Sequence, residues 1–171
     1  MREEKDALFN TEDAFPVDEQ LIDELKQRAA ASPTGRFRLC LHQSTDEVVQ
    51  DMLIVHCREN YSRPHRHPES AVSLKIIEGE LAVLLFDDQG EVTRTMELGP
   101  HGGGKAVCVR LAPGVWYATL CRSEMVVFYE TKQGPFVRDR SNNWAPWSPA
   151  EDDPSGIAAF QARIGIGPEV E

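Results

Sequence analysis

The sequence predicts an all-β domain, an antiparallel barrel or sandwich, on the strength of two observations. Residues 36–132 contain short runs rich in apolar and β-branched residues, with turn residues between them and no helical periodicity. The chain has 171 residues, of which 41% are hydrophobic and 27% charged, so one domain can bury a core without disulfides or a structural metal. The predicted strands cover residues 52–57, 73–77, 81–86, 91–98, 106–111 and 125–131.

The chain divides into three zones. Residues 1–35 are an N-terminal helical extension, in which apolar residues recur at helical spacing until Pro33 stops the helix. Residues 36–132 are the barrel. Residues 133–171 are rich in tryptophan and proline, and we expect them to be ordered, to wrap the barrel or a partner subunit, and to include a short terminal helix around Ile157, Phe160 and Ile164.

The charge excludes two classes of partner. With 18 Lys and Arg against 28 Asp and Glu, the formal net charge is −10, which argues against binding nucleic acid or an anionic membrane. No apolar run reaches the length of a membrane span, and no signal peptide is evident, so a cytoplasmic location is expected. The four cysteines are widely scattered and are interpreted as small buried residues.

The most distinctive local feature is the His-x-His motif of His65 and His67, between Pro64 and Pro68. Residues two apart on a strand point to the same face, so both imidazoles would converge on one point inside a barrel. Imidazole suits zinc, copper, iron and nickel. Taken alone, the motif is more typical of two surface histidines in a polar loop.

The order of motifs around this pair resembles the signature of the cupin superfamily. That signature is His-x-His, a glutamate and a glycine, then Pro-x-Gly and a histidine, and its four metal ligands lie in the mouth of a small β-barrel. Here His65, His67 and Gly79 match the first motif, and residues 112–117 (Ala-Pro-Gly-Val-Trp-Tyr) resemble the second motif. The wider pattern is similar to WbuC-type cupins, often encoded near bacterial surface-polysaccharide genes. It comprises residues 29–33, 36–42, 61–68, 76–80, 86–90, 113–116 and 145–151.

Two of the four ligands that this resemblance implies are replaced. The glutamate position falls on Val72 and the second histidine position on Tyr117. Tyr117 is a candidate third ligand or general acid/base, although a phenol pKa near ~10 makes it a poor zinc ligand. Glu69 is a replacement candidate, but a solvated loop acid is the better interpretation. The expected metal ligands are thus His65, His67, Tyr117 and Glu69, for divalent iron, zinc or nickel held weakly or incompletely.

Four residues are candidates for binding a ligand directly: Arg63, Lys75, His42 and Trp116. Arg63 and Lys75 are expected to border the pocket, where cations suit a small anion such as a sugar phosphate. His42 is interpreted equally well as a strand histidine that hydrogen-bonds to the backbone.

Three further residues are expected outside the site. Arg66 lies between two inward histidines and should point out of the barrel. His56, in an apolar strand, is interpreted as structural, and His101, in a glycine-rich turn, as solvated.

The functional hypothesis is a cupin-fold protein with a pocket for a small anionic or carbohydrate-like ligand, linked to surface-polysaccharide or sugar metabolism. Whether it is an enzyme stays open at this point. The alternative is a metal-free, non-catalytic binding or structural module. A homodimer is expected through barrel edges and terminal segments, because edge strands need covering.

Overall fold

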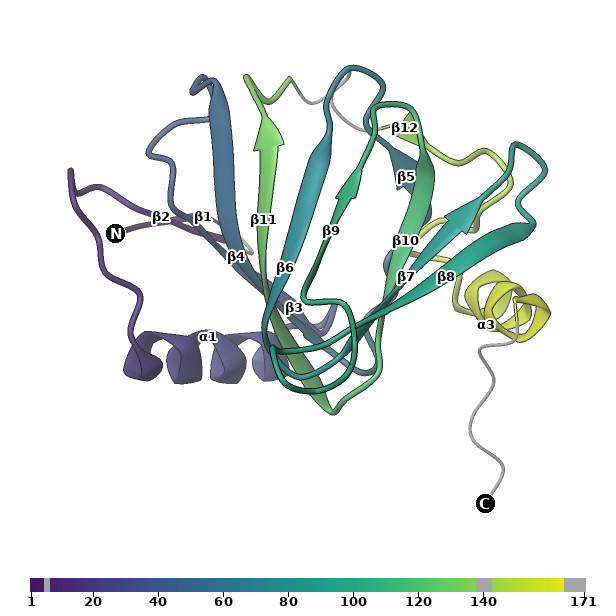
Figure 1. Ribbon diagram of the computed structural model, residues 1–171, viewed down its shortest axis with the longest axis horizontal. Helices are drawn as coiled ribbons and strands as arrows, with labels where there is room; N and C mark the ends of the chain where they lie inside the picture. The colour runs from purple at the N-terminus through teal and green to yellow at the C-terminus, as the bar shows by residue number, and fades with distance from the viewer. Residues whose placement is uncertain (5–6, 138–142, 165–171) are drawn as a thin grey trace.

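Two β-sheets face one another and enclose the core of the protein (Figure 1), in a computed structural model that describes residues 1–4, 7–137 and 143–164. In spatial order, the first sheet contains β1 (Arg2–Glu4), β2 (Ala7–Phe9), β3 (Arg36–Cys40), β4 (Val49–Cys57), β11 (Met125–Gln133), β6 (Val72–Glu78) and β9 (Cys108–Leu111). The second contains β12 (Asn143–Trp144), β5 (His65–Arg66), β10 (Trp116–Cys121), β7 (Leu81–Phe86) and β8 (Val92–Leu98). This is the predicted all-β barrel.

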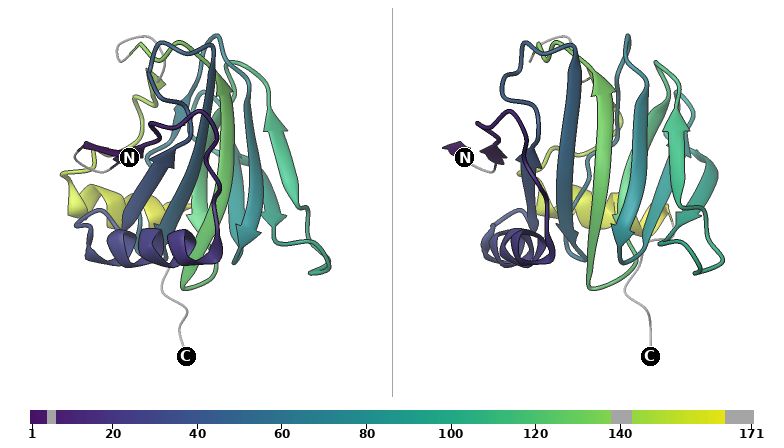
Figure 2. Two further views of the ribbon diagram at one scale, coloured as in Figure 1. Left: turned by 90° about the vertical axis from the view of Figure 1, so that its left-hand side faces the viewer. Right: turned by 60° about the vertical axis from the view of Figure 1, so that its left-hand side comes forward.

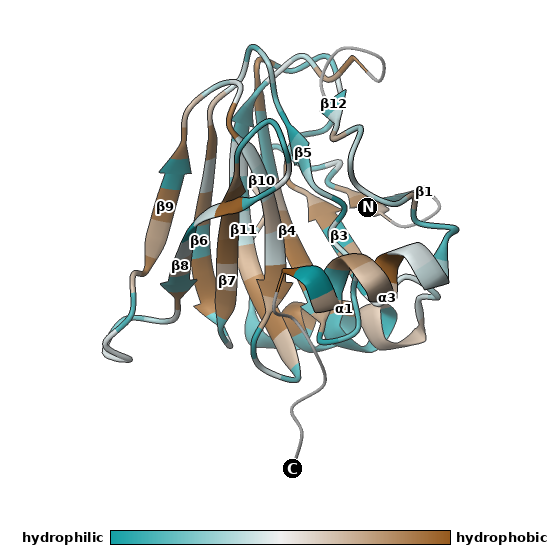
Figure 3. Cartoon of the chain, turned by 90° about the vertical axis from the view of Figure 1, so that its right-hand side faces the viewer, coloured by the Kyte–Doolittle hydropathy of each residue, from teal (hydrophilic) through white to brown (hydrophobic). Residues whose placement is uncertain are grey.

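The core between the sheets follows from the two-residue period of the strands. In β6, Val72, Leu74 and Ile76 are buried while the residues between them are exposed. They pack with inward residues of β7, β10 and β11, among them Val83 and Phe128. Figure 3 shows how hydrophobic residues follow the strands of both sheets, whereas the connecting loops are mostly hydrophilic.

Helix α1 (Glu19–Ala31) covers the outer face of the first sheet (Figure 2), as the N-terminal periodicity predicts. The Asp18 side chain caps it by accepting a hydrogen bond from the Leu21 amide at 2.9 Å. Its buried residues Ile22, Leu25 and Ala29 pack on β3 and β4. The helix ends before Pro33, as expected.

The C-terminal segment covers the outer face of the second sheet. Helix α3 (Pro154–Arg163) places Phe160 in a cluster with Phe86, Trp116 and Trp147. The Trp147 and Phe160 rings stack with their centroids 6.0 Å apart. The predicted terminal helix and an ordered, barrel-wrapping segment are therefore present within the described residues.

Several elements differ from the predicted ones. Residues 1–35 contain β1 and β2 besides the helix, and β2 pairs in parallel with β3. Strand β10 was not predicted because the C-terminal segment covers its outer face, so all six residues are buried and no polar alternation marks it. The four cysteines are free, and Cys108 is exposed rather than buried. No described helix is long and apolar enough to cross a membrane.

The contact between the β7–β8 turn and Trp147 can be tested at Gly90. Gly90 has φ +85°, and an added Cβ would lie 2.7 Å from Trp147 Cδ2. Gly102 has φ +92° but nothing within 4 Å of such a Cβ. Both Gly→Ala changes incur the positive-φ cost of about 1–2 kcal/mol, and Gly90→Ala should lose a further 1–3 kcal/mol, roughly, through overpacking. Urea unfolding measures the difference, and equal losses would contradict the contact.

Candidate functional site

A cavity of about 690 Å³ lies inside the barrel, with walls from both sheets. We call it the barrel cavity. Its polar and charged lining comes from β3, β4 and β11 in the first sheet, from β5 and β10 in the second, and from the segments flanking β5. These residues are Arg36, Arg38, His56, Ser62, Arg63, His65, His67, Tyr117, Thr119, Glu130 and Lys132.

The His-x-His motif and Tyr117 meet in this cavity. Strand β5 pairs His65 with Tyr117 of β10 on one side and with Trp144 of β12 on the other. His65 Nε2 lies 3.1 Å from the Tyr117 hydroxyl oxygen, and His67 Nε2 lies 3.2 Å from the same atom. The convergence of two imidazoles predicted from their spacing is therefore present, with a phenol between them.

The hydrogen-bond partners assign the protons. His65 Nδ1 lies 2.9 Å from the Arg63 carbonyl oxygen, which can only accept, so Nδ1 carries the proton and Nε2 offers a lone pair. The Tyr117 hydroxyl then donates to His65 and accepts from His67 Nε2–H. Two hydrogen bonds thus join the two imidazoles through one phenol.

The three converging atoms do not fit a tightly held metal. Their spacing is compatible with donors about 2.0–2.1 Å from one ion. However, burial and the nearby Glu130 raise the pKa of Tyr117 well above 10, so the phenol keeps its proton. The described residues contain no group of three or more His, Cys, Asp or Glu side chains able to hold a metal. Two neutral imidazoles fall short of the three or four protein ligands that zinc sites use.

Cationic side chains line the first-sheet wall of the cavity. Arg36 and Arg38 stand two apart on β3, and Lys132 stands two from Glu130 on β11. The Lys132 ammonium lies 3.9 Å from Glu130, and its side chain is only 10% exposed. Burial is the main cause that lowers the pKa of Lys132, and Arg38 lowers it further. Arg38 is exposed, and no hydrogen bond or ion pair of its guanidinium occurs among the described residues.

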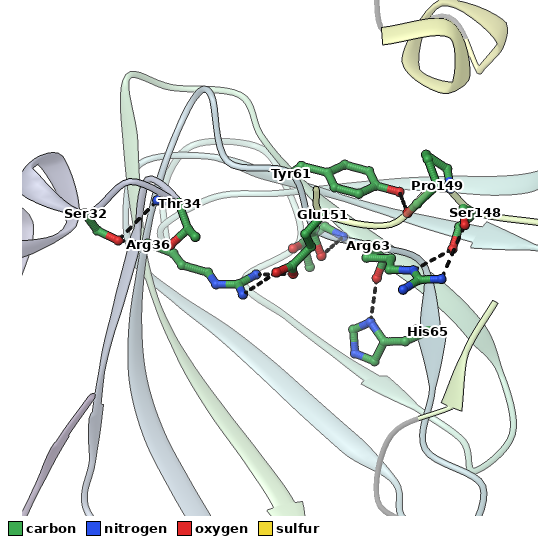
Figure 4. Close-up of polar contacts among 11 residues, drawn as sticks. Ser32, Thr34, Arg36, Tyr61, Arg63, His65, Ser148, Pro149 and Glu151 are labelled. Carbon is green, nitrogen blue, oxygen red and sulfur yellow. Dashed lines mark hydrogen bonds and ion pairs between the residues drawn. The ribbon is translucent and has the colours of Figure 1, made fainter. Parts of the chain in front are cut away.

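The C-terminal segment holds two of the cavity arginines in place (Figure 4). Glu151 accepts two hydrogen bonds from Arg36, at 3.0 and 3.2 Å. Arg63 donates to Ser148 Oγ at 3.1 Å, and its guanidinium lies 5.5 Å from the centre of the Trp144 ring. The positions of Arg36 and Arg63 are thus fixed by residues far away in the sequence.

Two candidate residues, Lys75 and Glu69, lie outside the cavity. Lys75 is exposed on the outer face of β6, because the inward positions of that strand belong to Leu74 and Ile76. Glu69 is exposed and does not line the cavity, since the chain has left the barrel wall at the exposed Pro68. Val72, at the expected glutamate position, is buried in the apolar core.

His42, a candidate for binding the ligand, is buried outside the cavity. It is 5% exposed, its ring lies edge-on to Phe9, and its Nδ1 lies 2.9 Å from the Asp51 carbonyl oxygen. This is the backbone-bonded alternative that the sequence left open.

Trp116 and Arg66 face the outside of the second sheet. Trp116 neighbours the inward Tyr117, so it points the opposite way, and its indole nitrogen donates to Asp88 at 2.9 Å. The Arg66 guanidinium lies 4.2 Å from the centre of the Trp116 ring, which confirms that Arg66 points out of the barrel. Trp116 as a cavity residue is therefore a wrong expectation.

Sequence reasoning missed several polar residues of the cavity, among them His56, Glu130 and Lys132. His56 is 8% exposed, and its Nδ1 is buried without a hydrogen-bond partner, which costs about 1–3 kcal/mol. The two-residue period was the available signal, because His56 shares a strand face with Met52 and Ile54, which also line the cavity.

Comparison with known proteins agrees with the fold. A family model described as a domain of unknown function (DUF6016) matches residues 17–98, and no curated protein matches the chain. Oxalate oxidase, solved in complex with the substrate analogue glycolate, is 12% identical over 81% of this chain and 76% of its own, with a TM-score of 0.53. An uncharacterized conserved protein with a double-stranded β-helix domain from Klebsiella pneumoniae is 15% identical over 67% and 82%, with a TM-score of 0.50.

These likenesses show the fold alone, which is a double-stranded β-helix. The chain spans only 27% of the length of oxalate decarboxylase from Lactobacillus farciminis, at 15% identity and a TM-score of 0.45.

The buried histidines predict acid sensitivity. Burial is the main cause that lowers the pKa of both His56 and His65 to about 3. From about pH 6.5 down to pH 3, the unfolded chain binds protons there that the folded chain does not. As the pH decreases over this range, the free energy of unfolding should therefore decrease by up to about 1.4 kcal/mol per pH unit for each histidine.

We expect the free energy of unfolding, measured with urea between pH 6 and pH 4, to depend less steeply on pH for His56→Leu than for the unsubstituted protein. Thr119→Val is the control, because it removes a cavity-lining polar group that does not titrate. An equal pH dependence of the free energy of unfolding in all three proteins would contradict the lowered pKa of His56.

Proposed function

We propose that this protein binds a small anionic, carbohydrate-like ligand in the barrel cavity. The observation that carries the proposal is the charge of the lining, in which Arg36, Arg38, Arg63 and Lys132 stand against one carboxylate, Glu130. Glu151 neutralises Arg36 from the rim. Among the described residues Arg38 has no such carboxylate partner, and Lys132 has Glu130 at 3.9 Å and the Phe136 ring at 5.3 Å. A protein of net charge −10 thus lines this cavity with more cationic than acidic side chains.

The dimensions and polarity of the cavity agree with this ligand class. A volume of about 690 Å³ lies within the roughly 300–1,000 Å³ typical of small-molecule pockets. Uncharged donors and acceptors, among them Tyr117, His65 and Thr119, line the cavity beside the cations. Such a mixture suits a molecule that carries both an anionic group and hydroxyl groups.

We propose that His65 and His67 bind a divalent metal only weakly. The trio lacks a carboxylate, and its phenol stays protonated, so a divalent ion would depend largely on exchangeable ligands. Tyr117 as an acid/base group, the connection with surface polysaccharides and the homodimer stay predictions. A metal-free binding module is the second candidate, and the missing third protein ligand is the observation that favours it.

The anion proposal can be tested by thermal and chemical unfolding with four probes: phosphate, glycolate, D-glucose 6-phosphate and D-glucuronate. At least one should stabilise the protein, by about 2.7 kcal/mol at a concentration of 100 Kd. Arg38→Gln should weaken the binding of that probe by about tenfold or more, because a hydrogen bond to a charged group is lost. Arg110→Gln, exposed on β9 and outside the cavity, is the matched control. The proposal fails if no probe stabilises, or if both arginine variants behave alike.

The metal proposal can be tested by elemental analysis of untagged protein purified without chelators. Iron, zinc and nickel should each be well below one equivalent, and added zinc should bind with a Kd that His65→Ala raises. His42→Ala, which removes a histidine outside the cavity, should leave zinc binding unchanged. One equivalent of metal that survives dialysis would overturn weak occupancy.

A further inference from the structure

We infer that His56 is a second polar contact of the barrel cavity, and that it binds a hydroxyl group of the ligand. This inference rests on the proposed function and deepens it, because it assigns an orientation to the ligand. The anionic group would lie toward Arg38, and a hydroxyl group would lie toward His56.

The first step is the state of the His56 ring. The ring lines the cavity and is 8% exposed, and its edge packs against Phe128 with the ring centroids 5.1 Å apart. No hydrogen bond of the imidazole occurs among the described residues, and Nδ1 is shut off from solvent, which leaves Nε2 as the nitrogen that a group in the cavity can reach. Buried polar side chains are usually hydrogen-bonded, so an imidazole without a partner at a cavity wall is suited to take a bound group.

The second step is the charge around His56. Its cross-strand neighbours are Arg36 on β3 and Val126 on β11. The Arg36 guanidinium is engaged by both carboxylate oxygens of Glu151. Burial, with Arg36 nearby, keeps the imidazole neutral. Arg36 is therefore neutralised beside His56, and the neutral imidazole offers Nε2 as one hydrogen-bond donor or acceptor to a hydroxyl group.

The third step is the distance to the anionic end. Arg38 pairs with Ile54, two residues from His56 along β4 and on the same face of the strand. Two strand residues span about 6.8 Å. A carboxylate at Arg38 and a hydroxyl at His56 can therefore belong to one six-carbon sugar acid, because the carboxylate and the far hydroxyl groups of such a molecule are separated by a similar distance.

Two probes of similar shape separate the contributions of charge and hydroxyl groups. D-Glucuronate has a six-membered ring with a carboxylate and hydroxyl groups, and cyclohexanecarboxylate has the ring and the carboxylate only. Titration calorimetry on the full chain should show glucuronate binding about tenfold more tightly or better, because the analogue leaves polar groups of the site unpaired.

His56→Phe should weaken the binding of glucuronate by about tenfold and leave that of cyclohexanecarboxylate unchanged, because the substitution keeps an aromatic ring and removes both nitrogens. His56→Gln, which keeps a donor and an acceptor, should retain most of the preference. His42→Phe is the control, since it also replaces a buried histidine but lies outside the cavity. Circular dichroism and a melting curve for each variant establish that it is folded.

Equal affinity for the two probes, or an unchanged preference in His56→Phe, would overturn the role of His56 and leave the proposed function standing. Failure of both probes, together with phosphate, glycolate and glucose 6-phosphate, would overturn the proposed function and this inference with it.

Discussion

The register that pairs His65 with Tyr117 is the constraint on which the rest of the site depends. Neighbouring residues of a strand point to opposite faces, so a shift of one residue would exchange Tyr117 for Trp116 inside the barrel. Both faces of β10 oppose that shift. The phenol is held by the two imidazoles, while the Trp116 indole is held outside by Asp88 and the Arg66 guanidinium.

The barrel interior is divided into an apolar part and a polar part. Inward residues of β6, β7 and β9 are aliphatic, and they include Val72 at the position where the cupin pattern has a carboxylate. Inward residues of β3 and β11 supply arginine and lysine instead. In the proposed function, these side chains provide the positive charge that an anion requires.

Much of the fold was predictable, because it depends on local patterns. The periodicity of α1 and the alternation in β6 survive in the structure, and β7 has the predicted bounds. Strand β10 was not predictable in this way, since its outer face is buried by a segment about thirty residues downstream in the chain.

The site was predictable only in part, for a related reason. The spacing of His65 and His67 places them together, but Lys75 was assigned to the pocket by its proximity in sequence, and its strand turns it outward. His56 shows the opposite error. A histidine in an apolar strand looks structural until the facing sheet is known, because only the tertiary structure decides whether its inward face meets core or cavity.

The ion pair of Arg36 with Glu151 closes a loop of 115 residues. The rim of the cavity is therefore completed only when the segment that carries Ser148 and Glu151 has docked on the barrel. Docking of this segment and occupancy of the cavity are then linked equilibria. By reciprocity, whatever a ligand gains from a docked C-terminal segment, the segment gains equally from the ligand.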